Sequence, residues 1–121
     1  MTTSIDLPFP PSVNNLFSNH RSSGRYPTKR YRDWQHAAGW QLAAQRPQRI
    51  TGAYDVLFQV GRPDNRKRDL SNLWKAPSDL LVKHAVIDDD NLERRVVMEW
   101  ADGLAGCRVV LTPVATQAEA A

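Results

Sequence analysis

A helical stretch enclosed between two β-like stretches constrains the fold more than any other feature of the chain. Residues 52–60 and residues 93–100 alternate apolar side chains with a period of two, which predicts two strands. Between them, the run from Ser71 or Asn72 to His84 has helical character. Pro77 lies inside this run, where it removes a backbone hydrogen bond. We therefore expect the second helix to be kinked, or to break and restart near Pro77.

The remaining elements follow from periodicity and turn residues. We expect a strand at Ser4–Phe9, an irregular loop rich in Pro, Ser, Asn and Gly up to residue 27, a helix at Thr28–Gln45, and a strand at Leu104–Thr112 that forms a hairpin with residues 93–100. This order predicts an α+β fold, with a small, mostly antiparallel or mixed sheet of about four strands and two helices on one face. We expect one domain at residues 1–114 and a flexible tail at 115–121.

Composition narrows the class of protein. The chain of 121 residues has 41% hydrophobic and 24% charged residues, which fits a single soluble domain. Its apolar runs are far shorter than the ~20 residues of a membrane span, and its first residues show no secretory pattern. Cys107 is the one cysteine, and the three histidines lack zinc-ligand spacing. We expect a cytoplasmic protein that uses no small-molecule cofactor.

Charge distribution says more than the formal net charge of +3. Five cations and no acid lie between residues 20 and 32, including Arg21 and Arg25. A second basic segment comprises Arg62, Arg66, Lys67 and Arg68. Two such segments favour binding to the phosphates of a nucleic acid, although solvated surface charge explains each segment alone equally well.

Two tryptophans lie on the predicted first helix. We expect Trp34 and Trp40 to be core or interface residues, with stacking on a nucleobase as the alternative.

The acids are placed at the two ends of the second helical run. Asp69 precedes the run, where it can cap the helix or present its carboxylate to a metal ion. Asp88, Asp89 and Asp90 follow the run. Mg²⁺ takes only one or two protein carboxylates, so Asp69 with one of the later acids would suffice, although such an acidic run also suits a turn.

Lys75 also has two interpretations. It precedes Asp79 by four residues, which is the spacing of an exposed ion pair on a helix. Alternatively, its ammonium group stabilises the extra negative charge of a phosphoryl transition state.

The segment Arg68-Asp69-Leu70-Ser71-Asn72-Leu73-Trp74-Lys75, followed by Ile87-Asp88-Asp89, resembles the RusA family of Holliday-junction resolvases. The P-P-S-x-N run at residues 10–14 and the length near 120 residues agree with this resemblance. It implies a homodimeric, Mg²⁺-dependent endonuclease of bacterial or phage origin, with Mn²⁺ as a possible substitute. Its substrate would be four-way junction DNA, cut by paired symmetric nicks.

The resemblance implies roles for individual residues. Asp69, Asp89 and Lys75 would be catalytic, and the metal ion would be bound by Asp69 and Asp89 with Asp88 beside them. The basic residues would bind DNA phosphates: Arg62, Arg66, Lys67, Arg68, Arg21 and Arg25.

One position departs from the family pattern. Ser71 stands where the family has a second aspartate, so the site lacks one negative charge and one strong oxygen ligand. Asp90 is a possible substitute ligand. Three interpretations remain open: a weakened or rewired nuclease, a natural inactive homologue, and a chain altered to trap DNA. The rival function is therefore a catalytically inactive dimer that binds branched DNA.

Overall fold

A four-stranded mixed sheet forms the body of the protein. The computed structural model describes residues 1–22 and 24–114 of the chain, so the predicted tail at 115–121 lies outside the described residues. The strands run in the order β1-β6-β4-β5, and their bounds are Thr3–Leu7 (β1), Cys107–Pro113 (β6), Tyr54–Val60 (β4) and Glu93–Trp100 (β5). The predicted α+β class is confirmed.

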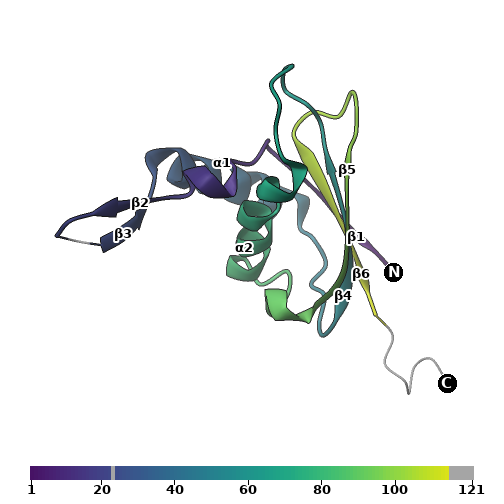
Figure 1. Ribbon diagram of the computed structural model, residues 1–121. Coiled ribbons are helices and arrows are strands. Elements are labelled where there is room, and N and C mark those ends of the chain that lie inside the picture. Colours follow the sequence, from purple (N-terminus) through teal and green to yellow (C-terminus); the bar gives the residue numbers. More distant parts are fainter. Residues whose placement is uncertain (23, 115–121) are drawn as a thin grey trace.

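Both α-helices, α1 (Lys29–Gln45) and α2 (Lys75–Lys83), lie on the same side of this sheet (Figure 1). Alternate residues of β4 point inward, so that Tyr54 and Phe58 are fully buried beneath the helices. The Phe58 ring packs against Trp74 with centroids 4.9 Å apart. Burial of these large rings stabilises the two-layer arrangement.

The first helix has the predicted bounds, and local chemistry explains them. The Thr28 side chain accepts a hydrogen bond from the Tyr31 backbone N–H, which satisfies one of the free donors of the first turn. Trp34 is buried and its indole N–H donates to the Pro8 carbonyl. Trp40, in contrast, is 71% exposed on the outer side of the helix.

The predicted hairpin between residues 93–100 and 104–112 is wrong. Strand β5 pairs in parallel with β4, from Tyr54–Glu93 to Val60–Trp100, whereas β6 lies between β4 and β1 and is antiparallel to both. Alternation identifies which residues share a face of the sheet, but it does not identify the neighbouring strand. The helical crossover between β4 and β5 supplies the long connection that a parallel pair requires.

The predicted irregular loop between residues 10 and 27 contains a second sheet. Strands β2 (Phe17–His20) and β3 (Gly24–Pro27) form an antiparallel hairpin, in which Asn19 pairs with Arg25. A short 3₁₀ turn at Val13–Asn15 precedes it. The hairpin projects away from the body of the protein (Figure 1). Its mostly polar sequence lacks the apolar alternation that marks buried strands.

The second helical run is interrupted, as predicted. A 3₁₀ turn, Leu70–Leu73, precedes Trp74, and α2 starts at Lys75. Pro77 is thereby the third residue of α2, where the missing N–H costs nothing because first-turn donors have no partner within the helix. The restart places Lys75 at the helix start.

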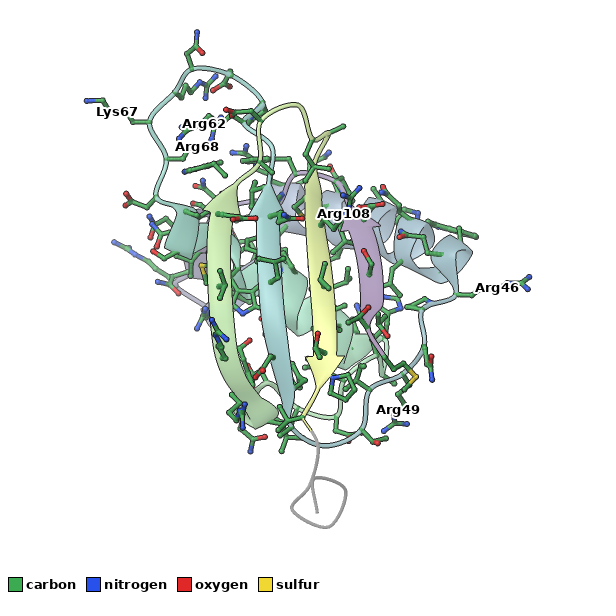
Figure 2. The ribbon with its side chains drawn as sticks, turned by 90° about the vertical axis from the view of Figure 1, so that its right-hand side faces the viewer. Arg46, Arg49, Arg62, Lys67, Arg68 and Arg108 are labelled. Carbon is green, nitrogen blue, oxygen red and sulfur yellow. The ribbon has the colours of Figure 1, made fainter. Side chains whose placement is uncertain are left out.

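The other face of the sheet is covered by neither helix (Figure 2). Among the described residues, no helix is long and apolar enough to cross a membrane.

Candidate functional site

The basic segment forms a loop that leaves the sheet at the end of β4. Gly61 is required there, because a Cβ atom would lie 1.7 Å from the Leu104 carbonyl oxygen. The Gly61 N–H donates to the Gly106 carbonyl at 2.9 Å, which ties the loop to the connection that leads into β6. Arg62, Lys67 and Arg68 therefore lie together beyond one end of the sheet (Figure 2).

Internal contacts hold three of the four predicted DNA-binding cations in this loop, namely Arg62, Arg66 and Arg68. The Arg68 guanidinium donates two hydrogen bonds to Asp64, at 2.6 and 3.0 Å, and the Arg66 backbone N–H donates to the same carboxylate at 2.9 Å. These bonds hold the pKa of Asp64 well below its ordinary value. Arg62 stacks over Trp100 with its Cζ atom 4.3 Å from the ring centroid.

Lys67 is exposed and points away from the body of the protein, so its charge is available to a partner (Figure 2). Asp64, which organises this loop, was not among the predicted site residues. Its spacing of four residues from Arg68 was the available signal.

A cleft of about 340 Å³ lies beside this loop and contains Asp69. Its walls come from three separate parts of the chain: the P-P-S-x-N run, the first helix and the basic loop. Lining residues include Ser12, Asn14, Arg30, Arg66, Lys67, Arg68 and Asn72. The cleft thus combines cations and amide groups around one carboxylate, which suits a phosphate group and a cation bound together. Arg30 and Asn72 were not among the predicted site residues.

The Asp69 side chain makes no capping hydrogen bond, although Asp69 is the N-cap residue of the 3₁₀ turn at Leu70–Leu73. Its backbone carbonyl instead accepts from the Asn72 N–H at 3.1 Å. Ser71 is exposed on the same turn. Of the two roles that the sequence allows for Asp69, the capping role is therefore not used, and the carboxylate faces solvent in the cleft.

Lys75 lies between two carboxylates. Its Nζ atom is 3.1 Å from Asp79 Oδ1 and 4.0 Å from Asp90 Oδ2. The helical spacing explains the first contact, whereas the second joins the start of α2 to a 3₁₀ turn that comes after the helix. Half of the Lys75 side chain remains exposed. Both interpretations of Lys75 are therefore compatible with its position, because an ion-paired ammonium group still faces the solvent.

Asp88 is held away from Lys75. Its carboxylate accepts hydrogen bonds from the Arg49 guanidinium and, at 3.2 Å, from the Gly52 backbone N–H. These donors lower its pKa. Arg49 lies at the end of the sheet opposite the basic loop (Figure 2). Asp88 thus has a structural role that joins the segment after α2 to the segment before β4.

Asp89 and Asp90 begin the third 3₁₀ turn, Asp90–Leu92. The Asp89 side chain caps this turn by accepting the Asn91 N–H at 3.0 Å, which lowers the Asp89 pKa. The Tyr54 hydroxyl group donates to the Asp89 backbone carbonyl at 3.5 Å. Burial, with these acids and Glu93 nearby, raises the pKa of Tyr54. Asp90 contacts the Lys75 ammonium group, whereas the Asp89 carboxylate is bonded within its own turn.

Glu93 is a further acid that sequence reasoning missed. Its Oε1 atom accepts from the Trp74 indole N–H at 2.8 Å. Burial raises the Glu93 pKa, the Trp74 hydrogen bond opposes this, and nearby Asp90 adds to it. Periodicity assigned residue 93 to a strand and gave no signal of its contact with Trp74.

The donor set suits an ion that needs few protein ligands. Among the described residues, no three Asp, Glu, His or Cys side chains gather around one point that could hold a metal ion. Mg²⁺ commonly binds one or two carboxylates and completes its octahedron with water and phosphate oxygens. Asp69 has no capping bond and lies in the cleft with the cations, whereas Asp90 contacts Lys75 and is not among the residues that line this cleft.

The remaining predicted cations, Arg21 and Arg25, lie on the projecting hairpin. Arg25 stacks over Phe17, with Cζ 3.9 Å from the ring centroid, and Arg21 is exposed. They are therefore carried by a different element from the cations around Asp69.

Two comparisons with known proteins relate this chain to one family. The family model of endodeoxyribonuclease RusA matches residues 8–112. The chain is also similar to the crossover junction endodeoxyribonuclease RusA of Aquifex aeolicus (strain VF5), with 29% identity over 110 residues. That alignment covers 88% of this chain and 86% of the relative.

Proposed function

The chain belongs to the RusA endodeoxyribonuclease family, as its resemblance indicated, and we propose that it is an endonuclease that hydrolyses phosphodiester bonds in four-way DNA junctions. The observation that carries this proposal is the Asp69 carboxylate, which lies without a capping bond in a cleft lined by arginine, lysine and asparagine. Cations hold the phosphates, and the carboxylate recruits the divalent ion that the reaction needs.

The proposed metal ligands are Asp69 and one acid of the Asp89–Asp90 pair. Asp90 is the better candidate of the two, because Asp89 already accepts a hydrogen bond from its own turn. Mg²⁺ or Mn²⁺, when bound, would polarise the scissile phosphate and lower the pKa of a bound water. Asp88 does not enter this set, since Arg49 and Gly52 occupy its oxygens.

The chain's own residues would position the substrate and stabilise charge. Lys75 would balance negative charge that develops on the phosphate, and its contacts with Asp79 and Asp90 restrict where the ammonium group can point. Lys67 and Arg66 would contact backbone phosphates directly. Arg68, held by Asp64, would shape the loop that presents them.

We also propose that the active form is a homodimer. The face of the sheet that lacks helices offers a surface for a second copy (Figure 2). A dimer would place two equivalent sites on a junction whose arms are related by near two-fold symmetry, and so produce paired nicks.

A nicking assay tests the proposed function. Labelled four-way junctions and linear duplexes of the same sequence are incubated in Mg²⁺ with the chain, with Ser71→Asp and with Asp69→Asn. We expect nicks in the junction alone, faster with Ser71→Asp and absent with Asp69→Asn. If the chain and Ser71→Asp both bind junctions tightly and neither cuts, the inactive DNA-binding dimer replaces the nuclease.

A further inference from the structure

A second cleft, separate from the one at Asp69, lies between α1 and the C-terminal end of α2. Its volume is about 480 Å³, which is in the range of sites that bind small organic molecules. Its lining residues include Arg32, His36, Gly39, Trp40, Lys83 and His84. None of them belongs to the proposed nuclease site. The two sites are related through α2, since Lys75 begins this helix and Lys83 ends it, about 12 Å apart at the rise of an α-helix.

The cleft is built by a close approach of the two helices. A Cβ atom at Gly39 would lie 3.1 Å from His84 Nε2, so the absence of a side chain there lets the imidazole pack against α1. Glycine is unfavourable inside a helix, and this contact is a physical reason for its presence. The residue after His84, Ala85, has a φ of 57° and ends the helical course, so His84 is held at the helix end.

Trp40 forms an aromatic wall of this cleft. With 71% of its surface exposed, it is an unusual tryptophan, because the large apolar ring is normally mostly buried. The His36 ring lies edge-on to it, with centroids 6.5 Å apart, and leaves the rest of the indole open. An open indole face of this kind can stack on a planar ring.

The charge of the cleft is positive. Arg32 and Lys83 contribute cations from the two helices, and no acid is among its lining residues in the described part of the chain. The nearest acid along α1, Asp33, forms an ion pair with Lys29 at 2.6 Å. A ligand that satisfies both the indole and the two cations must combine a planar ring with a negative charge.

We propose that this cleft binds an unpaired nucleotide of a DNA strand, with its base stacked on Trp40 and its phosphate held by Arg32 and Lys83. Nucleotides carry a planar base and an anionic phosphate in one unit, and single strands are bound in this way by aromatic platforms in basic grooves. In a four-way junction every base can pair, so the nucleotide bound here would be one that leaves the base stack at the point where strands exchange. The proposal thus deepens the proposed function, on which its biological substrate rests, while binding itself does not depend on cleavage.

The test measures binding without metal ions, so that cleavage does not enter. A short fluorescently labelled oligothymidylate is titrated with the full chain in EDTA, by anisotropy, at several salt concentrations. Stacking of one base on an aromatic ring changes affinity by about fivefold to 150-fold. We expect Trp40→Ala to weaken binding by about tenfold or more, and Trp40→Phe to retain most of it. Arg32→Gln and Lys83→Gln should each reduce the salt slope by about 0.7.

Arg46→Gln is the matched control, because Arg46 follows α1, lies outside the cleft and points away from the body of the protein (Figure 2). It removes the same charge and should leave oligonucleotide affinity close to that of the unchanged protein. Trp40 is exposed, so Trp40→Ala is expected to keep the circular dichroism spectrum and melting temperature, which are measured alongside.

Equal oligonucleotide affinity for Trp40→Ala and the unchanged protein would overturn the proposal. If the molecular mass of Trp40→Ala also changed in that case, the cleft would be assigned to contact with a second copy. Failure of the nuclease is distinguishable: oligonucleotide binding that depends on Trp40, together with no junction nicking by the unchanged chain, retains the cleft and rejects the enzyme.

Discussion

Lys75, at the start of α2, lies against Asp90 of the later turn Asp90–Leu92, with Nζ and Oδ2 4.0 Å apart. The contact joins the helix start to the acidic turn that follows the helix. The three consecutive acids at residues 88–90 have different environments. One is paired with Arg49, one caps its own turn, and one faces the lysine.

Replacing the lysine tests its proposed part in catalysis. Lys75→Met should lower the rate of junction nicking by roughly 10²- to 10³-fold, the usual effect of removing one group that stabilises transition-state charge. Asp79→Asn removes the helical ion-pair partner and keeps the ammonium group, so it should retain nicking within about threefold. Rates are measured at saturating junction under single-turnover conditions. Equal losses in the two variants, matched by equal falls in melting temperature, would reduce Lys75 to a structural residue.

Adding the missing carboxylate should change the metal requirement. Ser71 is exposed on the turn next to Asp69, so Ser71→Asp introduces a charge without burying it. We expect half-maximal nicking at a lower Mg²⁺ concentration and tighter Mn²⁺ binding by calorimetry. Ser71→Asn provides an uncharged control of similar size. An unchanged Mg²⁺ midpoint for Ser71→Asp would place position 71 outside the metal site.

The cations of the basic loop should differ in their effect on DNA binding. Lys67 points away from the body of the protein, so Lys67→Gln should weaken junction binding evenly across sequences and reduce the salt slope by about 0.9 (Figure 2). Arg68 is bonded to Asp64, so Arg68→Gln should increase cleavage of the loop by proteases in the free protein. Filter-binding affinity at several salt concentrations, with limited proteolysis, checks both. Identical effects of the two variants would contradict this division.

Asp64 should contribute a pH-dependent part of stability. Its hydrogen bonds to Arg68 and to the Arg66 backbone lower its pKa in the folded protein. A carboxyl group with a depressed folded pKa stabilises the fold above its unfolded pKa, about 3.9, and this contribution is lost as pH falls through the folded pKa. The melting temperature of the unchanged protein should thus exceed that of Asp64→Asn near pH 6, and the difference should shrink below pH 4. A constant difference across this range would show that Asp64 does not act through its charge.

Local sequence signals predicted the elements whose bounds depend on residues close by in the sequence. Thr28 caps the first helix as expected, the alternation at residues 52–60 is strand β4, and Pro77 marks a helix that restarts before it. The pairing of strands could not be found in this way. Residues 93–100 alternate equally well in a hairpin and in a parallel pair, and only the three-dimensional arrangement places β6 between β1 and β4.

In the candidate site, too, the features local in the sequence were predicted and the long-range contacts were not. The sequence placed acids at both ends of a helix with a lysine at its start, and the lysine does contact an acid from the far end. It did not distinguish among the three consecutive aspartates, because the partner of Asp88 is Arg49, 39 residues away. The resemblance implied Asp89 as a metal ligand with Asp88 beside it, whereas we propose Asp90, because Asp88 is bonded to Arg49 and Asp89 caps its own turn.

The most direct test of the proposed nuclease site compares two aspartates that are two positions apart. Asp90→Asn and Asp88→Asn each remove one charge from the run of three consecutive aspartates, and both are assayed for nicking of a four-way junction in Mg²⁺. Loss of a metal ligand costs several kcal/mol of transition-state stabilisation, so Asp90→Asn should nick at least about 100-fold more slowly while it still binds the junction. Asp88→Asn should melt at a lower temperature and keep nicking within about threefold. Full activity in Asp90→Asn, or loss of activity in a folded Asp88→Asn, would contradict the proposed site.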